Sequence, residues 1–195
     1  MPGGFIVQRQ KVGNQTEDNF VAGMAPNGAF NVPAGKLSIS NIPIGSVAYG
    51  SLGTNSTDVA GQFWITDIFI PFNRIISTIG VLQGGTATTD NILVAIWDSR
   101  GALVGNSALA GSLLAGANTF KELALLASVQ LFGPQQYYIG VQGNGATAGA
   151  LRTIAASTFP DVVANSIAGT FGTVPASITP ITTFTADKGP VVYVK

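Results

Sequence analysis

The stretch "ILVAIWDSRGALVGNS", residues 92–107, is the part of the sequence that decides the fold. Its first part, 92–97, is an uninterrupted apolar run that is too short for a convincing helix and is typical of a strand covered on both faces. The polar segment 98–101 ends in Gly101, which can take a positive φ angle without steric cost. The stretch therefore predicts a β-hairpin with a four-residue loop and a return strand over 102–107.

Strand patterns of the same kind recur at regular intervals from residue 62 onward. They are rich in β-branched and aromatic residues, and Gly or Pro separates them. The further predicted strands cover 62–70, 74–83, 119–125, 137–142, 150–157 and 190–195. This many short strands with turns between them predict an all-β fold, an antiparallel jelly-roll-like β-sandwich over 61–195. The residues expected in its core include Ile92, Val94, Ala95, Ile96, Trp97, Ile139 and Val141.

The segment 119–131 also permits a different structure. Thr119 and Glu122 have the spacing of a capping box, so "KELALLASVQL" could form a helix of about ten residues. The turn at Gly133 and Pro134 and the strand pattern that follows it favour a strand. Both alternatives stay open at this point.

Residues 1–60 differ from the rest because turn-forming pieces such as "APNGAFNVPAGK" separate short apolar stretches. We predict that they form an extended N-terminal arm that gains order when it binds a partner surface. The residues predicted to contact that partner are Phe5, Ile6, Val7, Phe20 and Phe30 as apolar anchors, with Arg9 and Lys11 at the rim. The alternative makes "FIVQRQ" and "KLSIS" edge strands of the sandwich.

The amino-acid composition excludes some classes of partner and favours others. The chain of 195 residues is 46% hydrophobic and 9% charged, and its net charge is zero. Ordinary domains carry roughly 25% charged residues, so this surface suits burial against other subunits. Zero net charge gives no attraction to nucleic acid or to an anionic membrane, and no apolar run is long enough to span a bilayer. We expect neither of those partners, and no signal peptide.

The residue types offer little for catalysis. Histidine and cysteine are absent, which removes the usual general base, nucleophile activator and transition-metal ligands. Paired carboxylates remain, as in glycosidases, but most of the acids lie in turn sequences, and Asp67 alone sits among aromatic and β-branched residues. No calcium-loop pattern occurs. We expect no catalytic residue, metal or cofactor. The candidate carboxylates are Glu17, Asp18, Asp58, Asp67, Asp90, Asp98, Glu122, Asp161 and Asp187.

Four aromatic residues could instead form a sugar-stacking platform. They are Trp64, Trp97, Tyr137 and Tyr138. Each lies inside a strand pattern, so packing in the core is the favoured interpretation.

The order "ILVAIWDSRGALVGNS", "NTFKELAL" and "LFGPQQYYIGVQGNG" resembles a pattern in β-sandwich proteins of tailed-phage virions. There, a strand ends in a "WD-x-x-G" turn, a later strand begins near "NTF", and a "YYIGVQ" strand follows a Gly/Pro turn. The resemblance covers about 92–145 and implies a jelly-roll module of a capsid decoration (cement) protein or of tail and fibre parts. It carries no functional residues across, because such modules share no active site.

These observations lead to one expected function and two alternatives. We expect a non-enzymatic virion structural protein that forms a homo-oligomer, for instance a trimer, and stabilises the capsid lattice by binding the major capsid protein or another virion protein. It would be made in the host cytoplasm and located at the capsid surface. A receptor- or carbohydrate-binding module of a tail fibre is the first alternative, and a carboxylate-based glycan hydrolase is the second.

Overall fold

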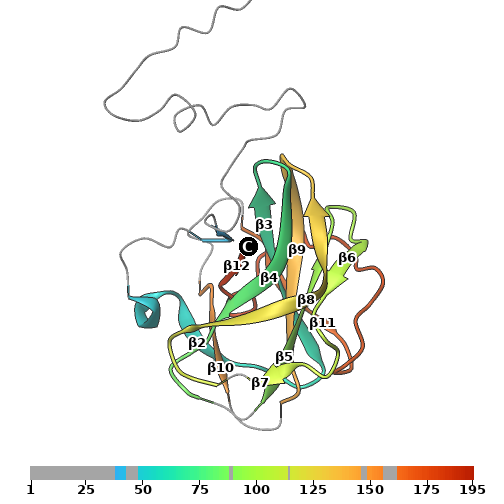
Figure 1. Cartoon of the computed structure of the whole chain (residues 1–195). Helices are drawn as coiled ribbons and strands as arrows, with labels where there is room; N and C mark the ends of the chain where they lie inside the picture. Colours follow the sequence, from blue (N-terminus) through green and yellow to red (C-terminus); the bar gives the residue numbers. More distant parts are fainter. Residues whose placement is uncertain (1–37, 43–47, 88–89, 114, 146–148, 156–161) are drawn as a thin grey trace, which may run out of the picture. The chain divides into compact units, whose positions relative to one another are not determined.

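The computed structural model describes residues 38–42, 48–87, 90–113, 115–145, 149–155 and 162–195 (Figure 1). Within this part of the chain the structure is built from β-strands and one 3-10 turn, η2 (Tyr49–Ser51), and contains no α-helix. None of its helical segments is long and apolar enough to cross a bilayer. The predicted all-β fold class is therefore confirmed.

The strands form two larger sheets and one small sheet, and every pair of strands is antiparallel. The four-stranded sheet has the order β1 (Ile39–Ser40), β12 (Val192–Val194), β4 (Arg74–Leu82), β8 (Phe120–Leu131). The six-stranded sheet has the order β11 (Ala164–Ala168), β3 (Gln62–Ile70), β9 (Gln135–Gly143), β5 (Asn91–Trp97), β6 (Leu103–Asn106), and β7 (Ser112–Leu113) also pairs with β5. The small sheet pairs β2 (Thr54–Thr57) with β10 (Ala150–Thr153).

The order of these strands is that of a jelly roll. The chain passes from β1 to β3 in the other sheet, back to β4, and across again to the hairpin of β5 and β6. It then crosses to β8, to β9 and finally to β12. The four-stranded sheet thus has the order 1-12-4-8, and the six-stranded sheet contains the order 3-9-5-6, extended by β11 outside β3 and by β7 beside β5. This is the double-sheet arrangement in which consecutive strands mostly lie in opposite layers.

The predicted hairpin at 92–107 forms in the structure. β5 pairs with β6, and the amide of Gly101 donates a hydrogen bond of 2.9 Å to the carbonyl of Asp98. The Asp98 carboxylate accepts hydrogen bonds from the Arg100 and Ala102 amides, each 2.9 Å long. Gly101 has a φ angle of +86°, which is why glycine suits this position. The "DSRG" segment is thus a turn stabilised by its own aspartate.

β5 is buried on both of its faces, as its uninterrupted apolar run predicts. Ile92, Val94 and Ile96 point into the core between the two sheets. The alternate residues Leu93, Ala95 and Trp97 point to the outer side of the six-stranded sheet, where they join a second buried cluster. All seven residues that the sequence analysis placed in the core are buried.

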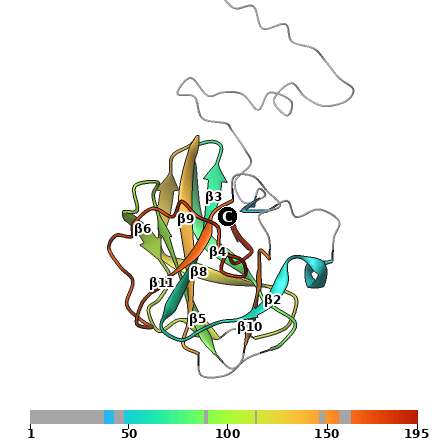
Figure 2. The same ribbon diagram turned by 180° about the vertical axis from the view of Figure 1, so that it is seen from behind.

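The second cluster is covered by an irregular segment near the end of the chain. Ile178 and Ile181 of that segment pack against Phe63 and Trp97, and the Trp97 indole donates a hydrogen bond of 3.0 Å to the Pro175 carbonyl. Figure 2 shows this orange-to-red segment on the β11 side of the sandwich. The covering segment lies in 158–189, a region outside the recognised pattern, so sequence reasoning did not identify what covers β5.

β8 settles the alternatives for 119–131 in favour of a strand, and a longer one than predicted. Its pairing with β4 shifts register, because Ile76 pairs with Val129 while Thr78 pairs with Ala124. Extra residues of β8 therefore bulge out of the ladder between these pairs. At the bulge, Leu125 forms a bridge to Ser107 beside β6, which links the edges of the two sheets.

The predicted boundary between residues 60 and 61 does not coincide with the limit of the sandwich. β1 pairs with β12, and β2 pairs with β10, although both strands precede residue 61. The compact unit starts at Ser38. Ile39 and Ser40, within the "KLSIS" stretch, form the edge strand β1 next to β12, as the alternative interpretation had it for this stretch. "FIVQRQ" and the rest of the predicted arm up to residue 37 lie outside the described residues.

Candidate functional site

The outer face of the four-stranded sheet carries a row of three residues from three neighbouring strands. Gly80 of β4 pairs with Tyr193 of β12 on one side and with Glu122 of β8 on the other. A Cβ atom on Gly80 would lie 2.3 Å from Cε1 of Tyr193, so the ring occupies the space above the glycine. The absence of a side chain at Gly80 lets Tyr193 and Glu122 meet across the central strand.

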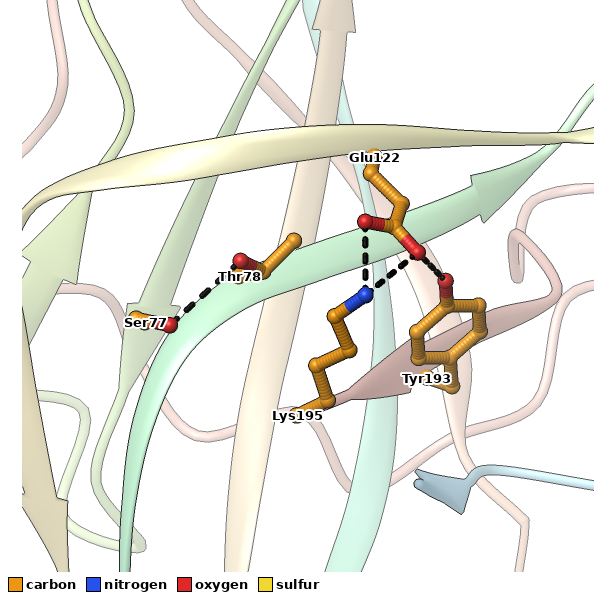
Figure 3. A network of polar contacts seen from close by, with 5 residues as sticks. All are labelled: Ser77, Thr78, Glu122, Tyr193 and Lys195. Atoms are coloured by element: carbon orange, nitrogen blue, oxygen red, sulfur yellow. Dashed lines mark hydrogen bonds and ion pairs between the residues drawn. The ribbon is translucent and has the colours of Figure 1, made fainter. Parts of the chain in front are cut away.

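Tyr193, Glu122 and Lys195 form a polar network on this face (Figure 3). The Tyr193 hydroxyl donates a hydrogen bond of 2.6 Å to the Glu122 carboxylate, and the Lys195 ammonium contacts both carboxylate oxygens at 2.8 Å. The hydrogen bonds from Lys195 and Tyr193 lower the pKa of Glu122. Burial and the hydrogen bond to Glu122 raise the pKa of Tyr193 well above its usual range, so the phenol stays neutral. The network is charge-compensated and lies at the surface.

A pocket of about 540 Å³ lies beside this network. Its lining residues are Ser38, Ser40, Tyr49, Phe120 and Tyr193. The Phe120 ring contacts the Tyr49 ring at 84° and the Tyr193 ring at 62°, with centroid distances of 5.1 and 4.8 Å. The wall of the pocket therefore combines three aromatic rings, set at steep angles to one another, with four hydroxyl groups.

The four aromatic residues considered from the sequence do not form a binding surface. Trp64, Trp97, Tyr137 and Tyr138 are all buried, and they pack in the two clusters on either side of the six-stranded sheet. The prediction that they belong to the core is confirmed.

The carboxylates assigned to turns have structural roles. Besides the Asp98 turn, Asp187 has a φ angle of +61° and accepts a hydrogen bond from the Thr54 hydroxyl. Asp67 accepts hydrogen bonds of 3.0 Å from the Val163 amide and from the Gln136 side chain, which fixes the chain before β11 against β3. The remaining candidates Glu17, Asp18 and Asp161 lie outside the described residues.

Asp58 and Asp90 are the two carboxylates that the fold brings into electrostatic contact. Burial raises the pKa of Asp58 to about 6, and the charge of Asp90 contributes to the rise. Asp90 is completely buried, so it cannot flank a glycosidic bond in the way that a pair of glycosidase carboxylates must. Among the described residues no group of three or more acidic side chains is placed to hold a metal ion.

Large apolar side chains are exposed on the same outer face as the polar network. Leu126, Ile75 and Phe132 have exposed fractions of 69%, 65% and 60%. Each is next in sequence to a core residue, Leu125, Ile76 or Leu131, and so points away from the core. Ile75 pairs with Gln130 of β8, and Phe132 follows directly after that strand.

Sequence reasoning did not find the pocket or the network. Alternation in "VVYVK" places Tyr193 and Lys195 on one face of their strand, but no local pattern says that Glu122, about 70 positions earlier, lies opposite. The predicted partner-contacting residues Phe5, Ile6, Val7, Arg9, Lys11, Phe20 and Phe30 all lie outside the described residues.

Comparison with known proteins adds no family to this description. Neither the protein-family models nor the curated proteins with which the sequence was compared match it.

Proposed function

We propose that this protein is a non-enzymatic virion structural protein of the capsid decoration type, which forms a homo-oligomer and stabilises the capsid lattice. The observation that carries the proposal is the exposed apolar group Ile75, Leu126 and Phe132 on the outer face of the four-stranded sheet. Exposed apolar side chains gathered on one face favour contact with another protein surface. The jelly-roll order, the low charge and the resemblance over 92–145 point to the same class.

The oligomer can be tested through two of these side chains. We expect light scattering to report an oligomer for the unmodified protein, and the double variant Ile75→Lys with Phe132→Ser to dissociate it. Phe69→Ser is the matched control, because Phe69 is also exposed, at 58%, but projects from the other sheet. A monodisperse monomer at high concentration would contradict the proposal, as would an equal loss of assembly in the Phe69 variant.

Attachment to the particle needs a separate experiment. In the proposal, the residues before Ser38 form the arm that binds the capsid, and Phe5 and Phe20 are two of its anchors. Deleting 1–37 removes none of the described strands, so the truncated protein should fold and show the same β-rich circular dichroism. It should fail to label native tailed-phage particles in immuno-electron microscopy, whereas the full chain should decorate the capsid. Labelling of the tail alone would contradict the capsid location.

A further inference from the structure

We propose that the pocket formed by Tyr49, Phe120 and Tyr193 on the outer face of the four-stranded sheet binds a neutral pyranose unit of a glycan. This inference does not rest on the assembly function proposed above, because the pocket and the exposed apolar residues involve different side chains. It concerns a part of the molecule that the sequence analysis did not single out.

The Tyr193 ring is held in a fixed position. One side of the Tyr193 ring lies against Gly80, where a Cβ atom would come within 2.3 to 2.8 Å of three ring atoms. The hydroxyl is held by Glu122, whose carboxylate is in turn held by Lys195. The ring is therefore immobilised before any ligand arrives, which lowers the entropy cost of stacking on it.

The wall of the pocket combines aromatic rings with hydroxyl groups. Tyr49, Phe120 and Tyr193 present ring surfaces, and Ser38 and Ser40 add hydroxyl groups at the same pocket. The Tyr193 and Ser40 hydroxyl groups already donate to Glu122 and to the Ile42 carbonyl, so their oxygens remain as acceptors that a purely apolar ligand would leave without water. A pyranose has a C–H face suited to an aromatic ring and a rim of hydroxyl groups suited to the polar part of this wall.

The charged side chains beside the pocket cancel each other. None of the described residues that line the pocket is charged, and Glu122 and Lys195, which lie beside it at the Tyr193 hydroxyl, neutralise each other across contacts of 2.8 Å. Their side chains are nevertheless 47% and 41% exposed, so oxygen acceptors and N–H donors remain within reach of solvent. A neutral molecule that both donates and accepts hydrogen bonds fits this edge better than a cation or an anion.

The pocket also has a suitable size. Its volume of about 540 Å³ lies within the range of small-molecule sites, which is roughly 300 to 1,000 Å³. One stacked face and a few hydrogen bonds in an open site correspond to a Kd of about 1 mM for a monosaccharide.

The experiment uses the full chain and saturation-transfer NMR with a panel of methyl pyranosides of glucose, galactose, mannose and N-acetylglucosamine. We expect at least one of them to bind, and its protons to receive saturation from the aromatic resonances. Tyr49→Ala should weaken that binding at least about tenfold, because it removes one ring wall. Tyr193→Phe, which keeps the ring and loses the hydroxyl, should weaken it less.

The matched control is Leu109→Ala, since Leu109 is exposed to a similar degree as Tyr49, 46% against 43%, and does not line the pocket. This variant should bind the pyranoside as the unmodified protein does. Three results would overturn the proposal: no pyranoside binds, binding survives unchanged in Tyr49→Ala, or choline binds more tightly than every sugar. Unchanged circular dichroism of each variant shows that the comparison is made between folded proteins.

Discussion

On the outer face of each sheet, an aromatic ring packs over a glycine of the neighbouring strand, but only one of the two rings is completely buried. On the six-stranded sheet, Trp97 lies over Gly140, where a Cβ atom would come within 2.6 Å of the indole. On the four-stranded sheet, Tyr193 lies over Gly80 in the same manner. The first ring is completely buried because an irregular segment with Ile178 covers it, whereas the second borders a pocket.

We call the outer side of the six-stranded sheet the closed face and the outer side of the four-stranded sheet the open face. The residues on each side explain the difference between them. The outer side of the six-stranded sheet carries apolar residues such as Phe63 and Leu93, whose burial gains free energy only when a second layer of chain covers them. The outer side of the four-stranded sheet is covered only at one end, where Leu82 packs with Ile42 and Leu52. Elsewhere it presents Glu122 and Lys195, which are stable in water, beside the exposed apolar group described above. The closed face therefore serves stability, and the open face is where a ligand or partner can bind.

The largest loss of stability is expected from a substitution in the buried cluster on the outer side of the six-stranded sheet. Replacing Trp97 with Ala should lower the free energy of unfolding by about 3–5 kcal/mol, because it leaves a cavity beside Phe63 and removes the hydrogen bond to Pro175. Denaturant titration measures the loss. Leu126→Ala is the comparison on the open face, and at a protein concentration low enough to dissociate the proposed oligomer it should change stability by no more than about 0.5 kcal/mol. Equal losses for the two variants would contradict the assignment of the faces.

A second substitution tests the covering segment itself. Ile178→Ala should cost about 2 kcal/mol, toward the lower end for buried isoleucine, because Ile178 lies at the margin of its cluster with 8% of its surface exposed. We expect faster amide hydrogen exchange in the covering segment of this variant, while β4 and β12 keep their protection. Exchange that stays unchanged in the covering segment would show that other contacts hold it in place.

The pH dependence of stability should differ in sign between Asp58, which is partly buried, and Glu122 on the open face. Asp58 should have the larger effect on stability. Its pKa rises from an ordinary value of 3.8 to about 6, mainly through burial. The folded state binds more protons than the unfolded state between these values, so stability falls as pH rises from about 4 to about 6. Asp58→Asn should stabilise the protein at pH 7 by about 1 kcal/mol, after allowance for partial exposure, and not at pH 4. Thermal unfolding at both pH values measures this, and a loss of stability at pH 7 would contradict it.

Glu122 should show a smaller effect of the opposite sign. Its pKa is lowered in the folded protein, so its contribution is present above the ordinary pKa of 4.5 and is lost as pH falls through the folded pKa. Glu122→Gln should cost a few tenths of a kcal/mol at pH 7, because exposed ion pairs contribute little. High salt should reduce the difference. A cost that is independent of salt would show that the hydrogen bond to Tyr193 dominates.

Local patterns were sufficient for the fold class and for most strands. β3 occupies the predicted residues 62–70, because the pattern of β-branched and aromatic residues in this strand stops at a proline. The hairpin around Asp98 follows from turn chemistry that needs no tertiary contact. β11 was missed because "ANSIA" is short and weakly apolar, and it is a strand only because β3 pairs with it.

The arrangement of side chains on the open face could not be predicted from the sequence, because it depends on contacts between distant strands. Glu122, Gly80 and Tyr193 come together through pairings between strands that are far apart in the sequence, and period-2 alternation says which face a residue takes but not its neighbours. The uninterrupted apolar run of β5 did indicate that both faces were covered. It did not identify the cover, because an irregular segment has no periodicity to recognise.

The place of β12 also bears on how the protein is made. β12 lies between β1 and β4, so Ile39 finds its partner Val194 only after almost the whole domain has been synthesised. Until then, the nascent chain carries β1 unpaired and one edge of β4 open, and such edges invite pairing with other chains. Closing so long a loop is slow, which gives chaperones a period in which to act. Pulse-labelling hydrogen exchange should accordingly find the β1 and β12 amides among the last to gain protection during refolding, and early protection there would contradict this order of events.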